Sequence, residues 1–416
     1  MIDWYDENQC HRTNPLDHDR TNGRIFRVSY GDDQPSRAID AKTLSTDELV
    51  AMLAHPNDWH VRHARRLIQE RAGSMDAAAK QALAATLSSK AFAGNDEKLR
   101  LNAFWALYTV ADLDEATVLR ALGDPNPNMR GWAIQFATQD DQLPTPAVLD
   151  QFAKLAASDP SPVVRLYLTS ALQRFPVEKC WPILQGLVAH SEDAEDHNLP
   201  LMVWYALEPA AAADPGRALA LAQTSSLPNL LSFTVRRVSA IGTAEALATL
   251  VDSLGKAQAD PVRLTILEGI NLSLQGRRQV EMPKPWPEVY QRLAASTDAA
   301  VRSQATSLAV TFGDPVALQS LRDLLKDASQ DLRSRQDALV ALLKARDPNL
   351  SPVLRDLISE AGFRSQAIRG LASYDDPETA PLILASYESL TPADRRDALN
   401  TLCARVESAK ALLTAV

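Results

Sequence analysis

The sequence predicts an all-α solenoid of about eleven helix pairs, preceded by a short β or irregular segment at the N-terminal end. Three observations predict this fold. An Arg-centred helical pattern recurs along the chain, Asp-Pro pairs punctuate it, and Ala and Leu supply most of the apolar residues. Self-similarity with a period of roughly 20–50 residues is the signature of stacked repeats. Each unit of such a stack packs only against its neighbours, so a long chain needs no single central core.

The repeat is clearest in residues 298–309, where Asp298 opens a helix and Arg302 follows one turn later. Ala305 and Ala309 lie three and seven residues after Arg302, which places them on one stripe of a helix. These two positions are apolar in every copy, and the other copies are Arg100/Ala103/Leu107, Arg130/Ala133/Ala137, Arg165/Leu168/Leu172, Arg263/Ile266/Ile270, Arg335/Ala338/Leu342, Arg364/Ala367/Leu371 and Arg395/Ala398/Leu402. The long interval between Arg165 and Arg263 is expected to hold two further units.

The recurring Arg has two interpretations. A line of exposed guanidinium groups could bind an acidic partner, because Arg pairs well with carboxylates. We favour a structural role, in which each Arg bonds Asp side chains or backbone carbonyls of a neighbouring unit and so forms a ladder along the stack.

The chain divides into three parts. Residues 23–31 are rich in β-branched and aromatic residues between two glycines, which predicts a strand within an N-terminal segment, 1–31. Residues 32–44 predict a polar linker, and residues 45–416 predict the solenoid. A capping box of Ser45 and Glu48 marks the start of the solenoid. The last residues, 408–416, indicate the start of another helix, so the solenoid is predicted to be truncated at its C-terminal end.

Asp-Pro pairs stand at many of the expected unit boundaries. Asp is favoured at the N-cap of a helix and Pro in its first turn, so each pair is expected to start a helix. The pairs lie at 124–125, 159–160, 214–215, 260–261, 314–315, 347–348 and 376–377.

Composition excludes several classes of protein. The net charge is −9 and no long Lys/Arg run occurs, which argues against a nucleic-acid binder. No apolar run reaches the length of a membrane span. The sequence has no Cys-x-x-Cys, so its three cysteines signal neither a zinc site nor haem attachment. Nucleophile-elbow, P-loop and dinucleotide motifs are missing as well. We therefore predict no catalytic, cofactor-binding or metal residues in this chain.

Candidate contact residues gather near the N-terminal end. Arg62, Arg65 and Arg66 form a basic cluster with His63, and Arg65 takes the plus-three position that is apolar in the other copies. This cluster could contact residues 1–43 or a preceding domain, and a solvated helix face is the alternative. His60 and His63 could ligate a metal, although a solvated face is favoured there too. The possible interdomain or partner contacts are Trp4, His11, Arg20, Arg24, Arg62, Arg65 and Arg66.

From residue 45 onward, the Asp…Val-Arg…Ala pattern resembles HEAT repeats. The resemblance covers most of the chain. It implies a scaffold that binds protein partners along the concave face formed by the second helix of each pair.

A narrower resemblance covers about 65 residues at the N-terminal end. It is carried by Asp3-Trp-Tyr-Asp6, Cys10-His11, Asp19-Arg-Thr-Asn-Gly-Arg-Ile-Phe-Arg-Val28 and Asn57-Asp-Trp59 with Arg62-His-Ala-Arg-Arg66. These motifs are similar to the junction in planctomycete-type membrane-bound dehydrogenases. There a β-propeller resembling glucose/sorbosone dehydrogenases precedes HEAT repeats, and a cytochrome c module often follows.

This second resemblance implies that residues 1–31 are the remnant of a last propeller blade. It also implies an exported or periplasmic parent protein with haem c, possessing sugar or alcohol dehydrogenase activity. The chain itself departs from that pattern, because it holds no Cys-x-x-Cys-His and almost none of a propeller. Taken alone, it also begins without a signal peptide, which would indicate the cytoplasm.

The leading hypothesis is a non-catalytic HEAT scaffold or protein-interaction module, the middle portion of a larger dehydrogenase-like redox protein. Its partner would be a protein or an adjacent domain. The alternative is an independent, lyase-like HEAT enzyme acting on a small molecule or a modified protein, which would need a polar constellation on the concave face. Nucleic-acid repair is a third class, and the acidic balance counts against it.

Overall fold

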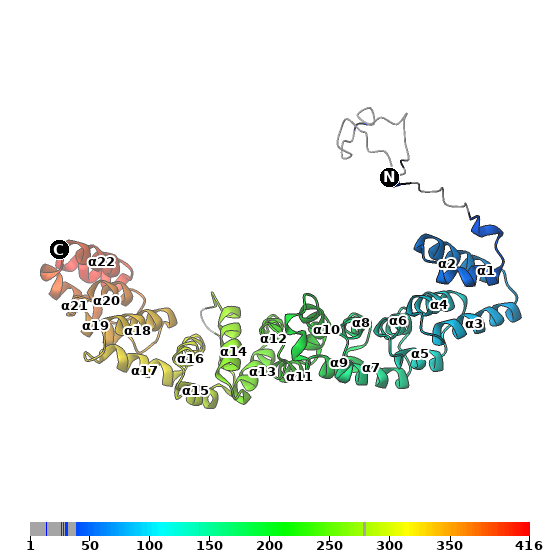
Figure 1. Cartoon of the computed structure of the whole chain (residues 1–416). Helices are drawn as coiled ribbons and strands as arrows, with labels where there is room; N and C mark the ends of the chain where they lie inside the picture. The colour runs from blue at the N-terminus through cyan, green and yellow to red at the C-terminus, as the bar shows by residue number, and fades with distance from the viewer. Residues whose placement is uncertain are drawn as a thin grey trace. The chain divides into compact units, whose positions relative to one another are not determined.

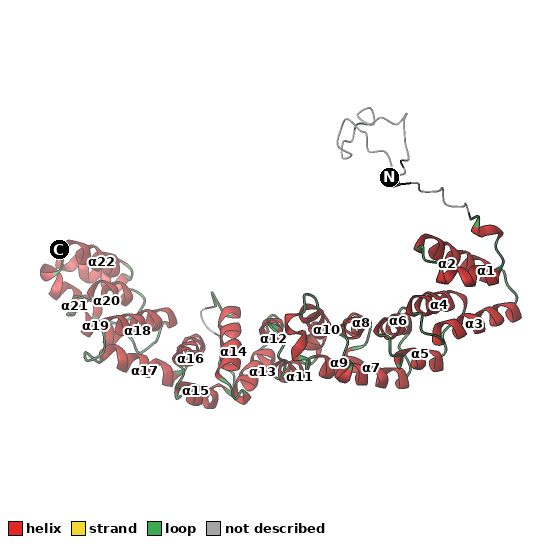
Figure 2. Cartoon of the chain, in the orientation of Figure 1, coloured by secondary structure: helices red, strands yellow, loops and turns green. Residues whose placement is uncertain are grey.

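A computed structural model of the chain describes residues 39–140, 142–277 and 280–416, together with residues 14, 26, 28, 30 and 31. The described residues fold into helices and loops and contain no strand (Figure 2). The predicted all-α solenoid is thereby confirmed. The blade remnant proposed for residues 1–31 and most of the linker, 32–44, fall outside the described residues. No helix in the described part of the chain is long and apolar enough to cross a bilayer.

The chain forms two compact units, Met1–Asp112 and Leu113–Val416, here called unit 1 and unit 2. In unit 1, α2 packs against α1 and α4, and α3 packs against α4. The capping box predicted at Ser45 is confirmed, because Ser45 N donates to Glu48 Oε2 at 2.6 Å and Glu48 N donates to Ser45 Oγ at 3.2 Å. The described elements of unit 1 are η2 (Ala41–Thr43), α1 (Thr46–Ala51), η3 (Met52–Ala54), α2 (Asp58–Ala72), α3 (Ala77–Phe92) and α4 (Glu97–Val110).

Unit 2 continues the helix pairs from α5 to α22 and ends with a single helix, α23. Together with the two pairs of unit 1, this gives the eleven pairs expected from the sequence. The helices are α5 (Glu115–Leu122), α6 (Pro127–Ala137), α7 (Pro146–Ser158), α8 (Pro162–Leu172), α9 (Val177–Leu187), α10 (Leu199–Ala213), α11 (Pro215–Gln223), α12 (Leu230–Ser239), α13 (Ala244–Lys256), α14 (Asp260–Ser273), α15 (Trp286–Ala294), α16 (Ala299–Phe312), α17 (Pro315–Lys326), α18 (Leu332–Ala345), α19 (Ser351–Leu357), α20 (Arg364–Leu371), α21 (Thr379–Ser386), α22 (Pro392–Cys403) and α23 (Val406–Ala415). Two 3-10 turns join them, η4 (Ser191–Glu195) and η5 (Tyr387–Ser389).

The helices of unit 2 lie in two rows. From α5 to α16, each second helix contacts the second helices of the adjoining pairs, and most first helices contact one another in the same way (Figure 1). Apolar side chains fill the space between the rows. The recurring stripe lies there as predicted, since Ala305 and Ala309 are both fully buried. Burying each Leu of such a stripe contributes roughly 1.5–3 kcal/mol.

Close helix contact in the first-helix row depends on one glycine of α9. A Cβ added at Gly186 would lie 2.7 Å from the backbone carbon of Ala156 and 2.7 Å from the backbone nitrogen of Ala157. Those atoms belong to α7, and backbone cannot yield as a side chain does. Glycine is therefore required for α9 to approach α7 at this distance.

We predict that Gly186→Ala lowers the free energy of unfolding by about 1–3 kcal/mol, the usual cost of overpacking. Gly216→Ala is the matched control. Gly216 also lies in a first helix, α11, but a Cβ there would meet its nearest atom at 3.8 Å. This control should be neutral or stabilising by up to about 1 kcal/mol. Urea denaturation followed by circular dichroism compares the two, and equal effects would contradict the proposed contact.

The role of the Asp-Pro pairs is only partly as predicted. Asp214 and Asp314 do cap α11 and α17, each with Pro in the first turn. The prediction is wrong for Asp124 and Asp159, whose carboxylates accept hydrogen bonds from the amides of Asn126 and Ser161, two residues further on. The same arrangement recurs at Asp347 and Asp376. These four carboxylates shape the turn before the helix.

Carboxylates at helix starts are held in their charged form. Hydrogen bonds from Thr117 lower the pKa of Asp114, and hydrogen bonds from Ser334 lower the pKa of Asp331. The pKa of the buried Asp394 is lowered first by a hydrogen bond from Ser365. A folded-state pKa below the unfolded value stabilises the fold at pH values above the unfolded pKa.

We therefore expect stability to fall in acid. The contribution of these groups is fully present well above the ordinary Asp value of 3.8 and is lost as the pH falls through their lowered folded-state pKa values. Urea midpoints measured from pH 6 to about pH 3 test this. Asp394→Asn should flatten the acid limb of the curve, and an unchanged limb would contradict the assignment.

Candidate partner-binding surface

The recurring Arg belongs to the scaffold. In all eight copies its guanidinium donates to a backbone carbonyl at or just after the end of the preceding helix. Such carbonyls have no partner within their own helix, and cations near them are favoured by the helix dipole. The donor–acceptor pairs are Arg100 with Ala91, Arg130 with Asp124, Arg165 with Asp159, Arg263 with Ala257, Arg302 with Ser296, Arg335 with Leu325, Arg364 with Ile358 and Arg395 with Tyr387.

Three copies also reach the next unit. Arg130 binds Asp159 through two hydrogen bonds of 2.7 Å, and Arg335 binds Glu360 at 2.9 Å. Arg165 binds Asp193 through two hydrogen bonds and is only 1% exposed. Its hydrogen bond to Asp193 raises the pKa of the Arg165 guanidinium. The predicted ladder between units is thus present at these copies, while the acceptor common to all copies lies within the Arg's own pair.

A different set of side chains, apolar and at least partly exposed, lies on neighbouring second helices of unit 2 and is here called the aromatic strip. Its most exposed members are Tyr205 at 51%, Leu201 at 46% and Val163 at 38%. Half-buried aromatic rings complete it. It consists of Trp132 and Phe136 on α6, Val163 and Tyr167 on α8, Leu201, Trp204 and Tyr205 on α10, and Phe233 on α12.

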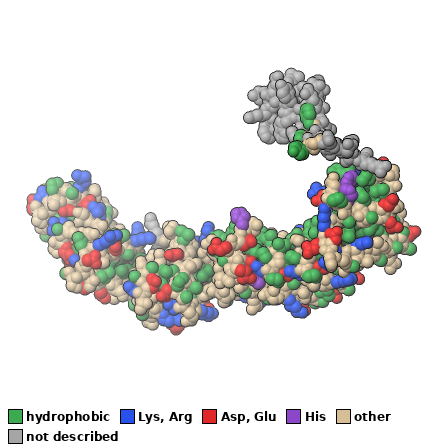
Figure 3. Space-filling model, viewed as in Figure 1, with side chains coloured by type: hydrophobic (Ala, Val, Ile, Leu, Met, Phe, Trp, Pro, Cys, Tyr) green, Lys and Arg blue, Asp and Glu red, His purple; other side chains and the backbone are tan. Residues whose placement is uncertain are grey.

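Ring contacts join the helices that carry the strip. The ring centroids of Trp132 and Tyr167 lie 6.1 Å apart between α6 and α8, and those of Trp204 and Phe233 lie 5.5 Å apart between α10 and α12. Such tilted pairs hold the rings in place. Partial burial raises the pKa of Tyr167, which stays neutral near pH 7. The face of unit 2 seen in Figure 3 carries hydrophobic side chains interspersed with acidic ones.

An acidic loop, residues 188–198, joins α9 to α10 and binds Arg165 of α8. His190 fixes the loop, because its Nε2 lies 2.8 Å from the carbonyl oxygen of Ala156 and its Nδ1 lies 2.6 Å from Glu192 Oε1. The hydrogen bond to His190 lowers the pKa of Glu192. Glu192 also lies 3.7 Å from Arg165, and Glu195 beside it is exposed. The loop therefore presents negative charge in a fixed position.

Sequence reasoning missed the strip, although a signal was present. Trp132 and Tyr167 each follow a recurring Arg by two residues, and Tyr205 follows the buried Val203 by the same interval. Two residues turn about 200° around a helix, so a side chain two positions from a buried one faces away from the core. In the other Arg copies this position is polar.

The predicted contact residues are only partly described. Trp4, His11, Arg20 and Arg24 lie outside the described residues. Arg62 is exposed, and Arg66 pairs with Glu70 at 3.2 Å. Arg65 is half-buried, with its guanidinium 4.5 Å from the ring centroid of Trp105, and desolvation lowers its pKa. Arg65 thus packs within unit 1, and an interdomain role for the cluster stays a prediction.

Three of the remaining histidines, His55, His60 and His63, lie around Trp59 at the start of α2. His63 stacks on Trp59 at 3.8 Å, and His60 meets His55 edge-on. Burial raises the pKa of the Cys180 thiol to about 11, which keeps it protonated. Among the residues described, no three His, Cys, Asp or Glu side chains gather as metal ligands would.

No family model matches the chain, and no curated protein matches it. Among solved structures it is similar to Kap121p, with 14% identity and a TM-score of 0.42 over 88% of this chain and 46% of that one. The chain is similar to Kap121p bound to Pho4p as well, with 14% identity and a TM-score of 0.41 over 88% of this chain and 46% of that one. The Kap95p–RanGDP structure gives 13% identity and a TM-score of 0.31 over 89% of this chain and 60% of that one. This chain spans less than half the length of Kap121p, and its fold assignment rests on its own helix pairs.

We predict that Arg165→Met lowers the free energy of unfolding by about 3–5 kcal/mol, because it leaves the Asp193 carboxylate buried without a partner. Arg369→Met is the matched control. Arg369 pairs with Asp397 at 2.7 Å but is more than half exposed, so this change should cost at most about 1 kcal/mol. Chemical denaturation measures both.

A second variant separates the lost pair from a general packing defect. Arg165→Met combined with Asp193→Leu removes the orphaned charge and should recover most of the lost stability. A double variant as unstable as Arg165→Met alone would show that the carboxylate is not the cause.

Proposed function

We propose that this chain is a non-catalytic scaffold that binds a partner protein along the aromatic strip. The observation that carries the proposal is the set of exposed apolar side chains, Val163, Leu201 and Tyr205, on the neighbouring second helices α8 and α10. Contiguous apolar surface on a soluble protein marks interaction sites, and aromatic residues are enriched where partners bind.

The acidic loop indicates the chemistry of the partner. Glu192 and Glu195 lie in the loop that leads into α10, the helix that carries Leu201, and the hydrogen bonds of His190 hold this loop against α7. Complementary charge steers a partner and fixes its register. The expected occupant is therefore an extended segment of another protein that carries aromatic or aliphatic side chains alternating with Lys or Arg.

Fluorescence anisotropy with three labelled peptides tests this proposal on the full chain. One peptide combines Phe and Leu with Lys, the second replaces Lys with Glu, and the third replaces the apolar residues with Ser. The first should bind most tightly, and its affinity should fall with added salt. The double change Leu201→Ser and Tyr205→Ser should weaken it at least tenfold, because central aromatic contacts contribute about 2 kcal/mol or more.

Two matched variants keep the result specific. Val316→Ser changes an exposed apolar residue of α17 that lies outside the strip, and it should leave binding unchanged. Glu195→Lys should weaken binding of the Lys peptide and improve binding of the Glu peptide. Equal binding of all three peptides would contradict the proposal. Light scattering tests a further alternative. If the chain forms a dimer that the double change Leu201→Ser and Tyr205→Ser dissociates, a second copy covers the strip and the proposal is contradicted.

We also propose that the scaffold is the middle module of a larger dehydrogenase-like redox protein, where it would space a propeller and a cytochrome. The support is the resemblance of residues 1–66 alone. The reading frame on either side of the chain tests it. Propeller strands before Met1 and a Cys-x-x-Cys-His after Val416 are expected, and stop codons close to both ends would contradict the proposal.

A further inference from the structure

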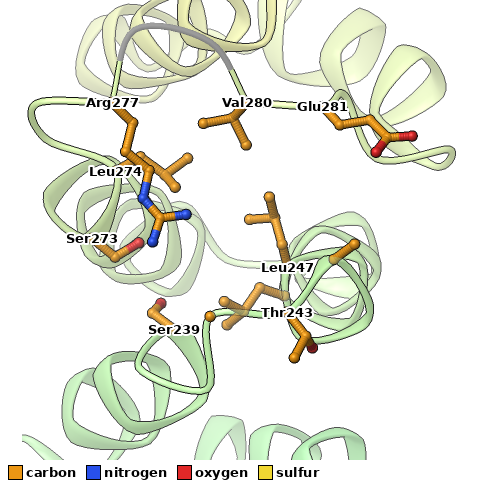
Figure 4. A pocket seen from close by; sticks show the side chains of 11 residues that line it. Ser239, Thr243, Leu247, Ser273, Leu274, Arg277, Val280 and Glu281 are labelled. Carbon is orange, nitrogen blue, oxygen red and sulfur yellow. The ribbon is translucent and has the colours of Figure 1, made fainter.

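A hollow of about 280 Å³ lies away from the aromatic strip, between the ends of α12 and α14, the start of α13 and the connector that follows α14. Leu247, Leu274 and Val280 form apolar walls (Figure 4). Ligand pockets are typically apolar concavities with a few placed polar groups. Ligand pockets usually measure roughly 300–1,000 Å³. The hollow is close to the small end of this range, and its volume suits a single amino-acid residue.

Polar groups gather on one side of this hollow. Figure 4 shows the guanidinium of Arg277 directed into it, with the hydroxyls of Ser239 and Ser273 on the same side. Ser273 Oγ donates to the carbonyl of Ile270 at 2.8 Å. Ser239 Oγ is buried and has no hydrogen-bond partner among the described residues. A buried hydroxyl without a partner is uncommon, because it loses its bonds to water and gains nothing in return.

Two donors of the hollow, the Ser239 hydroxyl and the Arg277 guanidinium, have no acceptor among the described residues. Arg277 is exposed, and its guanidinium makes no hydrogen bond or ion pair with any described residue. Glu281 also lines the hollow, but its carboxylate points away from Arg277 (Figure 4). Because a guanidinium is always charged and offers two parallel N–H groups, it matches an oxyanion. The long side chain of Arg277 can shift to admit such a group beside Ser239.

We propose that this hollow binds a carboxylate carried on a short aliphatic body, such as the free carboxyl end of a peptide that ends in Leu or Val. The carboxylate accepts hydrogen bonds from Arg277 and Ser239, and the aliphatic chain covers Leu247, Leu274 and Val280. The apolar walls distinguish this ligand from inorganic phosphate, which would gain nothing from them.

Isothermal titration calorimetry of the full chain tests the proposal with four probes: N-acetyl-leucine, its neutral amide, acetate and inorganic phosphate. N-acetyl-leucine should bind at least tenfold more tightly than each of the others. Arg277→Gln should weaken its binding at least tenfold, since a charge-assisted bidentate pair is lost. Ser239→Ala should weaken it about threefold to tenfold, in keeping with the loss of one hydrogen bond.

Arg236→Gln is the matched control, because Arg236 is an exposed residue of α12 that does not line the hollow. It should leave the affinity unchanged, as should the strip change Tyr205→Ser, so this site and the strip are tested separately. Unaltered melting temperatures show that the variants are folded. The proposal is overturned if N-acetyl-leucine shows no binding at millimolar concentration, if Arg277→Gln leaves its affinity unchanged, or if phosphate binds as tightly.

Discussion

The hydrogen bond from the recurring Arg to the end of the preceding helix is the constraint on which the repeat depends. Backbone carbonyls at a helix end need partners, and water cannot reach those that lie between packed helices. Arg165 Nη1 donates to the backbone carbonyl of Asp159, and Arg165 Nε donates to the carboxylate of Asp193. One side chain thus joins the two helices of its own pair and attaches that pair to the next. The cost of burying the charge is offset because each of the three guanidinium nitrogens has an acceptor.

This arrangement separates structural from functional positions along each second helix. The buried position is occupied by Arg130 in α6, Arg165 in α8 and Val203 in α10, and all three are nearly or fully buried. Two residues later, the side chain points away from the buried stripe. Aromatic residues occupy that outward position in α6, α8 and α10. A row of aromatic groups can therefore be placed on a regular scaffold by residues that lie outside its buried stripe.

Much of the fold was predictable because its signals are local. The capping box at Ser45, the apolar stripe after each Arg and the number of pairs all depend on residues within one or two turns of each other. The Asp-Pro pairs show where local reasoning fails. An Asp before Pro can either cap the following helix or shape the turn before it. The neighbouring unit determines which of these two roles the carboxylate takes. Asp159 lies in the turn because Arg130, almost one repeat earlier, holds its carboxylate.

The candidate sites were harder to predict, since they combine residues from separate units. The strip needs the outward direction of side chains on four helices, and the hollow needs Ser239 of α12 beside Arg277 of the connector. That connector is also where the repeat is least regular. At the other junctions between pairs of unit 2 the connector is shorter, and at Gly313 and Asp314 it is only two residues long. After α14 it takes a longer path, and the junction holds a hollow with an unsatisfied hydroxyl at its edge. Because the Ser239 hydroxyl has no partner among the described residues there, a ligand in the hollow can supply the hydrogen bond that the protein lacks.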